Sequence, residues 1–334
     1  MIDDIRAHLD ALAKPRGAMG RLEALATELA LTQGRVDART APRRAVLFAA
    51  DHGCVAEGVS AWPSEVTQMM VATILSGRAT SNALATAADC PLRLVDVGMM
   101  GVRASGPGFF RDARVGDGSA PLGAGPALTV AQFDAAWAVG ADEAAAAVDA
   151  GAMLLIAGEM GIGNTTPAAC LTALLTGLDP DAAVGRGAGA DDVVLATKRR
   201  IVALATKRAA GIADVRERIA SVAGYEIAAM AGFYATGAAR GATLLLDGYV
   251  ATAAAMIAEA LAPGSVRAMI AGHRSAEPGH GAALAALALT PVLDWEMRLG
   301  EGSGALVALP LLDAAAALLN DVVRLDQIGA DRAD

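Results

Sequence analysis

One carboxylate stands among glycines in the stretch "MRLGEGSGALVALP", which runs from Met297 to Pro310. Glu301 lies between Gly300 and Gly302, and an apolar run that favours a helix follows it. Glycines let a ligand approach the main chain closely, and the N-terminus of a helix favours the ionised form of an acid. A capping acid would explain a charge near a helix start, but it would not explain the glycines. Glu301 is therefore a candidate acid–base group.

A second stretch with chemical potential is "GEMGIGNTT", residues 158–166, whose pattern indicates a strand, a glycine loop and a helix. Backbone N–H groups at such a junction bind phosphate well. The loop is not a dinucleotide fingerprint, because Thr166 stands in place of the third glycine. It is not a P-loop either, because Asn164 occupies the position of the phosphate-binding lysine. The pattern favours a single phosphate over a nucleoside triphosphate, and a tight turn needed only for packing is the alternative.

A possible second anion site begins at "GRGAG", residues 185–189. Lys198 would lie about two turns into the helix that follows. The alternative for Lys198 is a solvated side chain, which is the commoner state of a lysine. Asp191 and Asp192 could hold Mg²⁺, but at an expected helix start they fit capping acids better.

Other kinds of site find little support in the chain. His52, His273 and His280 fall in expected loops and lack the i, i+4 spacing of a helical metal site. The absence of a G-x-S-x-G stretch disfavours an α/β-hydrolase. The three cysteines are far apart and odd in number, which offers neither a disulfide framework nor metal-ligand spacing.

Alternating strands and helices must position these stretches. Short apolar runs predict strands at residues 44–50, 92–98, 152–158, 242–248 and 266–272. Helices are expected at residues 2–13, 19–33, 64–87, 130–150, 249–261 and 304–320, and also after the two glycine loops and over 224–239. The segment 99–127 is rich in glycine and proline and is expected to be irregular. The alternation implies right-handed βαβ units and a Rossmann-like, mainly parallel α/β sheet flanked by helices.

Ligands of such sheets bind at the carboxyl ends of the strands. The unusual loops of this chain follow the expected strands: "DHG", "DVGMMG", "GEMGIGNTT", "DGY" and "GHRSAEPGH". We therefore expect the active site at that edge of a large Rossmann-like domain, residues 41–289. Both chain ends, residues 1–40 and 290–334, are expected to form a small helical domain.

Composition limits the class of protein further. The 334 residues are 54% hydrophobic, with a mean hydropathy of +0.44, so a sizeable core can be buried. A net charge of −9 argues against general binding of nucleic acid or anionic membranes. Charged residues interrupt each candidate membrane span, and the acidic N-terminus has no apolar signal core. We expect a cytoplasmic protein that binds neither nucleic acid nor membrane.

Eight stretches in order along nearly the whole chain resemble one family, the nicotinate-nucleotide–dimethylbenzimidazole phosphoribosyltransferases of cobalamin nucleotide-loop assembly. The first four are "KPRGAMGRLE", "ADHGCVAEGVSAWPSEVTQMMV", "GEMGIGNTTPAA" and "GRGAGADD". The other four are "GYEIAAMAGF", "LLDGYVATAAA", "GHRSAEPGH" and "MRLGEGSGALVALPLL". The resemblance implies transfer of 5-phosphoribose from nicotinate mononucleotide to 5,6-dimethylbenzimidazole. The products would be nicotinate and α-ribazole 5′-phosphate, with inversion at C1′. It also implies a homodimer that uses no cofactor and no metal.

The resemblance implies a role for each matching residue. Glu301 matches the family's general base, and Glu159 matches a second acid near the reacting centre. Ser60 and Gln68 match positions that line the benzimidazole pocket, and Asp247 lies in a matching strand-end loop that contacts substrate. The positions expected to hold the phosphate and ribose of the nucleotide are Gly161, Gly163, Asn164, Thr165, Gly187, Lys198 and Ser275. One departure is Trp62, which stands where a smaller aromatic residue is common and would reshape the base pocket.

A single carboxylate is enough for this reaction. Nicotinate leaves as a pyridinium that becomes neutral and needs no proton, whereas the attacking benzimidazole must lose its N–H proton to a base.

One rival function is an NAD-dependent dehydrogenase, which the missing third glycine disfavours. The other is a catalytically silent nucleotide-binding protein in cobamide assembly, which an intact Glu301 disfavours.

Overall fold

The computed structural model describes residues 1–329 of the chain. Residues 330–334, part of the expected small helical domain, lie outside this range. Within it, the strands are β1 (Arg43–Ala50), β2 (Leu92–Gly98), β3 (Phe110–Asp112), β4 (Leu154–Met160), β5 (Thr243–Leu246) and β6 (Met269–Ala271). They form one six-stranded sheet in the order β3-β2-β1-β4-β5-β6.

Every pair of neighbouring strands in this sheet is parallel. The strand order is that of a doubly wound Rossmann sheet, which reverses direction between β1 and β4. Residues 45–50 of β1 and all of β4 and β5 are buried, as expected for strands covered on both faces. The predicted Rossmann-like α/β class is confirmed.

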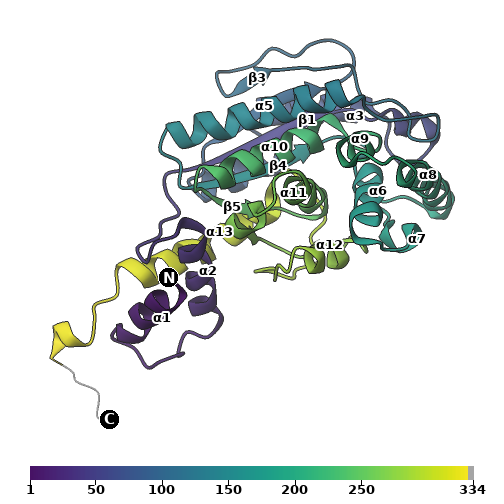
Figure 1. Ribbon diagram of the computed structural model, residues 1–334. Helices are drawn as coiled ribbons and strands as arrows, with labels where there is room; N and C mark the ends of the chain where they lie inside the picture. The colour runs from purple at the N-terminus through teal and green to yellow at the C-terminus, as the bar shows by residue number, and fades with distance from the viewer. Residues whose placement is uncertain (330–334) are drawn as a thin grey trace.

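Helices cover both faces of the sheet (Figure 1). In the first half of the chain they are α1 (Ile2–Ala11), α2 (Arg21–Gln33), α3 (Glu65–Leu75), α4 (Thr80–Ala87), α5 (Val130–Asp149) and α6 (Thr165–Thr176). In the second half they are α7 (Pro180–Ala183), α8 (Asp192–Ala210), α9 (Val215–Ala220), α10 (Tyr225–Ala239), α11 (Tyr249–Leu261), α12 (His280–Ala286) and α13 (Ser303–Asn320). Three short 3₁₀ helices are η1 (Gly53–Glu57), η2 (Ser265–Ala268) and η3 (Asp326–Ile328). Helices α5 and α10 pack side by side over β1 and β4. Helix α3 also contacts β1 and β4, while α2 and α13 contact the half of the sheet that contains β5.

Several predicted boundaries were wrong. The helix expected over 64–87 is two helices, α3 and α4, because Gly77 adopts φ of +75° between them. The segment 99–127, expected to be irregular, contains the short strand β3. Strand β4 spans 154–160 rather than 152–158, so Glu159 belongs to the end of the strand and not to the loop.

Both chain ends lie together at one end of the molecule (Figure 1). Apolar side chains of α1, α2 and α13 share one buried cluster, which also includes residues of β4, β5 and β6. Because the start of α13 packs on the sheet and its later turns pack on α2, this helix joins the two regions. The boundaries of the two expected domains stay a prediction.

Helix α13 is the one helix of the described residues that is long and apolar enough to cross a membrane by length and composition. It has 18 residues and a hydropathy of 1.6, and 61% of the helix is buried inside the protein. Its Asp313 accepts hydrogen bonds from Thr40 Oγ1 at 2.5 Å and from Arg43 Nη1 at 2.6 Å. These contacts are those of a core helix.

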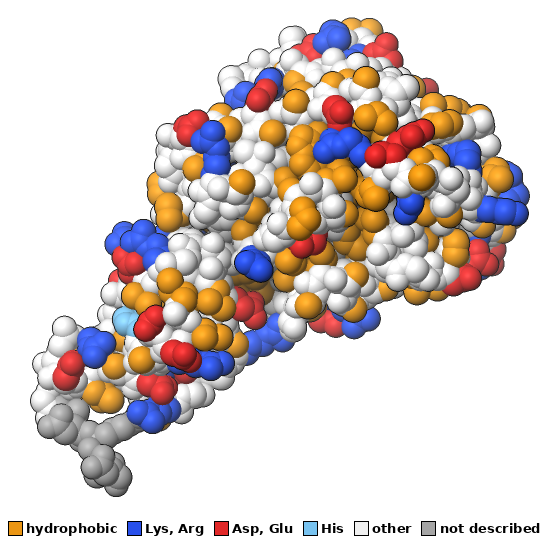
Figure 2. Space-filling model, in the orientation of Figure 1, with side chains coloured by type: hydrophobic (Ala, Val, Ile, Leu, Met, Phe, Trp, Pro, Cys, Tyr) orange, Lys and Arg blue, Asp and Glu red, His pale blue; other side chains and the backbone are white. Residues whose placement is uncertain are grey.

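Figure 2 shows one face of the molecule, on which hydrophobic side chains gather in a hollow of the larger body with basic and acidic side chains around it. Several large apolar side chains are well exposed in the single chain, among them Val102, Val193 and Met69. Exposed apolar groups of this size are candidates for contacts with other molecules.

Candidate functional site

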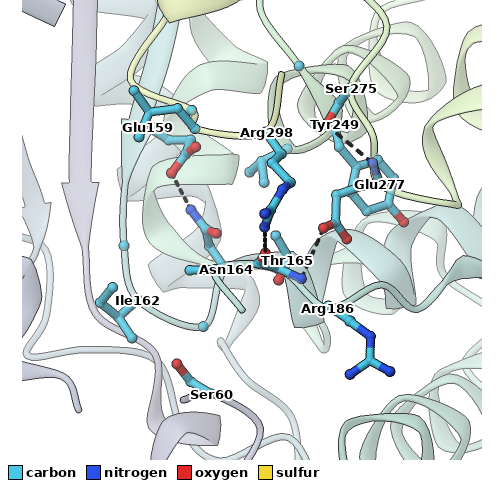
Figure 3. Close-up of a pocket in the computed structure, with 18 of the residues that line it drawn as sticks. Ser60, Glu159, Ile162, Asn164, Thr165, Arg186, Tyr249, Ser275, Glu277 and Arg298 are labelled. Atoms are coloured by element: carbon cyan, nitrogen blue, oxygen red, sulfur yellow. Dashed lines mark hydrogen bonds between the residues drawn. The ribbon is translucent and has the colours of Figure 1, made fainter. Parts of the chain in front are cut away.

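A cavity that is partly open to solvent lies at the carboxyl ends of β4, β5 and β6 (Figure 3). It also reaches residues 59–61, which follow β1, so it sits where the strand order reverses. This is the position at which doubly wound sheets bind their ligands. The cavity therefore lies at the strand edge to which the sequence assigned the active site.

Most of the residues assigned from the resemblance line this one cavity. They are Ser60, Glu159, Gly161, Gly163, Asn164, Thr165, Gly187, Lys198, Asp247 and Ser275. Two assigned residues do not line it. Glu301 follows the cavity-lining Gly300 and its side chain is buried, and the amide of Gln68 donates to Met100 O at 2.6 Å on the outside of α3.

The glycine loop that joins β4 to α6 packs closely on the segment after β1. A side chain on Gly161 would meet Ala50 O at 2.5 Å, and one on Gly163 would meet Val55 Cγ2 at 2.7 Å. Gly163 also adopts φ of +92°. Close packing therefore explains why both positions are glycine, as in the alternative interpretation of this loop as a tight turn. The same loop places the N-terminus of α6, with Thr165 as its first residue, on the cavity wall, where its N–H groups can face an anion.

Lys198 is not a solvated lysine, since only 2% of it is exposed. Its Nζ donates to Thr165 Oγ1 at 2.7 Å and to Gly185 O at 3.0 Å, which ties α8 to the start of α6. Burial lowers the pKa of Lys198, and the carboxylate of Glu277 opposes that shift. A lysine ammonium has three N–H donors, so one donor remains for a ligand in the cavity.

The sequence did not identify two residues that shape the same wall. Glu277 accepts a hydrogen bond from Gly187 N at 3.0 Å, and Arg298 Nη1 donates to Gly187 O at 3.2 Å (Figure 3). Together they fix the second glycine loop from both sides. Their only sequence signal was membership of "GHRSAEPGH" and "MRLGEG", the loops already assigned to the active-site edge.

Ser275 is held by a histidine that is not a metal ligand. His280 Nδ1 accepts from Ser275 N at 2.7 Å, and its Nε2 lies 2.9 Å from Thr252 Oγ1. Burial, assisted by His273 and Arg274, lowers the pKa of His280 to about 3, so the ring is neutral and Nδ1 can accept. Among residues 1–329 no group of three or more His, Cys, Asp or Glu side chains could hold a metal ion.

Glu159 ends β4 and is buried in the cavity wall, where Asn164 Nδ2 donates to its carboxyl group (Figure 3). Burial raises the pKa of Glu159 well above its usual value, and the nearby charges of Asp247, Glu226 and Glu301 raise it further. The raised pKa favours the protonated form of this carboxyl group, which can donate a hydrogen bond.

Asp247, at the end of β5, caps the start of α13. Its Oδ2 accepts from Gly302 N at 3.0 Å and its Oδ1 from Gly304 N at 2.7 Å. Burial raises its pKa, and His273 opposes the shift from 3.7 Å away. Both oxygens are thus used to hold the loop that carries Glu301, and the substrate contact expected of Asp247 stays a prediction.

The backbone around Glu301 is unusual. Gly300, Glu301 and Gly302 adopt φ of +90°, +59° and +71°, so three consecutive residues are left-handed and one of them is not glycine. Such a conformation is costly for a side chain with a Cβ and is found mostly at functional sites. The N–H of Glu301 donates to Glu159 O at 3.3 Å, which places the two acids side by side. The glycines that flank Glu301 in the sequence are therefore explained in part by the left-handed backbone at their positions.

Trp62 lies beside the cavity, next to the lining residues Ala61 and Ala188. Its backbone N–H donates to Ser60 Oγ at 3.0 Å, and its indole Nε1 donates to Ala188 O at 3.1 Å. The indole ring therefore bridges the segment after β1 and the second glycine loop, next to the position assigned to the base.

Three comparisons agree on the relatives of this chain. A family model described as "Phosphoribosyltransferase" matches residues 1–329. The nicotinate-nucleotide–dimethylbenzimidazole phosphoribosyltransferase of Thermus thermophilus is 47% identical over 315 residues, which cover 94% of each chain. The protein of the same name from Mycobacterium marinum is 49% identical over 330 residues, which cover 98% of this chain and 92% of that one. The crystal structure of CobT from Thermus thermophilus superposes with a TM-score of 0.95 at 45% identity and covers 99% of both chains.

Proposed function

Because this chain belongs to the nicotinate-nucleotide–dimethylbenzimidazole phosphoribosyltransferase family, we propose that it moves 5-phosphoribose from nicotinate mononucleotide to 5,6-dimethylbenzimidazole. The products are nicotinate and α-ribazole 5′-phosphate. The observation that carries the proposal is one cavity at a strand edge, lined by a glycine loop and the buried Lys198, with the buried Glu301 next in sequence to its lining residue Gly300. N–H donors and a lysine favour the phosphate, and a carboxylate can take the proton of the incoming base.

The nucleotide phosphate binds at the start of α6. The N–H groups of Gly163 and Thr165 and the remaining donor of Lys198 lie at one end of the cavity, and both kinds of donor favour an anion. Gly187 and Ser275 lie on the same walls and contact the ribose. Binding the phosphate fixes C1′ relative to the attacking ring, and this positioning supplies much of the rate.

The base binds on the other side of C1′, next to Ser60 and near the buried Glu301, and the contact expected of Gln68 stays a prediction because Gln68 does not line the cavity. As one ring nitrogen of the benzimidazole attacks C1′, the other N–H becomes more acidic and gives its proton to the Glu301 carboxylate. The C1′–N bond to nicotinate breaks at the same time, and its electron pair stays on the pyridine nitrogen. Attack on the face opposite the leaving group inverts C1′ and gives the α-anomer.

Glu159 is the second acid at this centre. Its raised pKa favours the protonated form, which suits the role of a hydrogen-bond donor beside the base Glu301. No step of this scheme needs a metal or a cofactor. The rival dehydrogenase is disfavoured because the loop after β1, where dinucleotides bind, runs from Asp51 directly into η1 without the glycine fingerprint.

The proposal includes a homodimer in the cytoplasm and a division into a large domain, residues 41–289, and a small domain, residues 1–40 and 290–334. Packing of α1 and α2 against α13 supports the second domain. Three free, buried cysteines fit a reducing compartment.

The test is to incubate the purified chain with nicotinate mononucleotide and 5,6-dimethylbenzimidazole and to separate the products by chromatography. The proposal expects equal amounts of nicotinate and a phosphoribosylated base, with an α-configured C1′ in the NMR spectrum. Reaction in excess EDTA should be unchanged. If nucleotide binds but no nicotinate appears, the silent binding protein is the better account. If NADH fluorescence changes on titration, a dehydrogenase must be reconsidered.

A further inference from the structure

The carboxylate of Glu301 is held by a residue that lies 220 positions away in the chain. Ser81 is fully buried in the first turn of α4. Its Oγ donates to Glu301 Oε2 at 2.9 Å, and its backbone N–H reaches the same oxygen at 3.4 Å. Nothing in the sequence pattern linked these two residues.

The start of α4 has a local reason to bind a carboxylate. Its N-cap residue is Ala79, whose methyl group cannot accept a hydrogen bond. Asn82 Oδ1 accepts the N–H of Ala79 at 3.0 Å, but the free N–H of Ser81 must find an acceptor elsewhere. Glu301 Oε2 supplies that acceptor, and the helix N-terminus favours its negative charge.

The two oxygens of Glu301 are therefore unequal. Oε2 has two donors, whereas Oε1 is buried and has no hydrogen-bond partner among residues 1–329. The acids and bases that face Glu301 are otherwise engaged, with Glu159 bonded to Asn164, and Asp247 and His273 beside the start of α13. Only Oε1 remains to accept a proton.

We propose that Ser81 is a positioning residue that fixes Oε2 of Glu301 and so presents Oε1 as the atom that takes the benzimidazole proton. This inference rests on the proposed function. In the step, the N–H bond of the base breaks and an O–H bond forms on Oε1, while Oε2 keeps its hydrogen bonds from Ser81. The bond from the Ser81 hydroxyl is charge-assisted, and such bonds are stronger than those between neutral groups.

The test compares Ser81→Ala with Asn82→Ala, which weakens the same helix start without touching Glu301. Loss of one hydrogen bond to a charged group predicts that kcat of Ser81→Ala falls about tenfold and that the acid limb of its pH profile moves up by about one pH unit. The KM for nicotinate mononucleotide should not change. Asn82→Ala should keep the wild-type pH profile.

Wild-type kcat and pH profile in Ser81→Ala would overturn the inference, as would an equal shift in Asn82→Ala. If Glu301→Gln abolishes turnover while Ser81→Ala does not affect it, only the role of Ser81 fails. If Glu301→Gln turns over normally, the proposed function fails as well. Should Ser81→Ala not fold, a wild-type crystal with bound 5,6-dimethylbenzimidazole decides, because the ring N–H must lie nearest Oε1 and not Oε2.

Discussion

Lys198 shows how burial changes the role of a single side chain. Its ammonium group is bonded to Thr165 Oγ1 and Gly185 O and is almost removed from solvent. The sequence placed it two turns into a helix but could not tell a buried lysine from a solvated one. The difference depends on α6 and α7 packing over α8, which is a long-range contact.

Lys198→Ala should raise the KM for nicotinate mononucleotide much more than it lowers kcat. Loss of one charge-assisted hydrogen bond to the phosphate predicts an increase of about 10–100-fold. Steady-state kinetics with Lys207→Ala, an exposed lysine of the same helix, provide the control. An unchanged KM in Lys198→Ala would remove this residue from the phosphate site.

Glu159 makes the stability of the protein depend on pH. Because its pKa is raised in the folded protein, the folded state holds a proton that the unfolded state has lost, and stability falls as pH rises above the usual value of 4.5. Glu159→Gln keeps an acceptor for Asn164 but has no charge to bury. Its thermal midpoint should exceed that of wild type by a few degrees at pH 8, and the gap should close toward pH 4.5. Glu65→Gln, at an exposed site, should show no such gap. A gap independent of pH in Glu159→Gln would contradict the buried-acid account.

The residue types of the site were easier to predict than their contacts. Glycines around Glu301 and the strand-end loops pointed to the edge of the sheet at which the cavity lies, because local sequence determines turns and strand ends. Ser81, Glu277 and Arg298 could not be found in this way, since each acts on a partner distant in sequence. Their geometry exists only after the sheet has formed.

At the scale of elements, the start of α13 is the least tolerant part of the site. The helix begins against His273, which Gly304 touches so closely that an added Cβ would overlap the imidazole ring. Gly302, two residues earlier, has room for a Cβ at ordinary van der Waals distance, with Ile156 Cγ2 nearest at 3.5 Å, but it adopts φ of +71°. Sequence patterns predicted a helix here within one residue, but not which ring it meets.

Replacing these two glycines should therefore have different costs. Gly302→Ala should lose about 1–2 kcal/mol of stability from its left-handed backbone alone. Gly304→Ala should lose about 3 kcal/mol or more, because either His273 or the helix must move. Denaturant unfolding of both variants measures the difference. Equal losses would mean that His273 can move aside at little cost.

The predicted elements failed mostly at their ends. Apolar runs located the strands because central parallel strands are covered on both faces. The break between α3 and α4 was missed because "SGRA" interrupts an otherwise helical pattern only through the left-handed Gly77. Strand β3, with three residues at the sheet edge, is too short to leave a periodic pattern.

At the scale of the whole molecule, the two chain ends meet on α13, whose start carries Glu301 and whose later turns pack on α2. The strained left-handed backbone at residues 300–302 is therefore held in place by the packing of α13 on α2. The large apolar side chains exposed on the single chain, such as Met69 and Val102, suit burial against a second copy.

We expect a homodimer in solution. Light scattering at micromolar concentration should give twice the mass of one chain. The same measurement should compare the mass of Met69→Lys with that of Leu31→Lys, which changes an exposed apolar position on α2. A monomeric wild-type protein with full turnover would show that one chain is sufficient for the reaction.

The central claim is that the carboxylate of Glu301 takes the proton of the incoming base, and turnover of Glu301→Gln tests it most directly. The amide has nearly the same shape and can still accept from Ser81, but it is a far weaker base. The account predicts a kcat lower by about a hundredfold or more, with binding of both substrates and thermal stability close to wild type. A kcat near that of wild type would contradict the account.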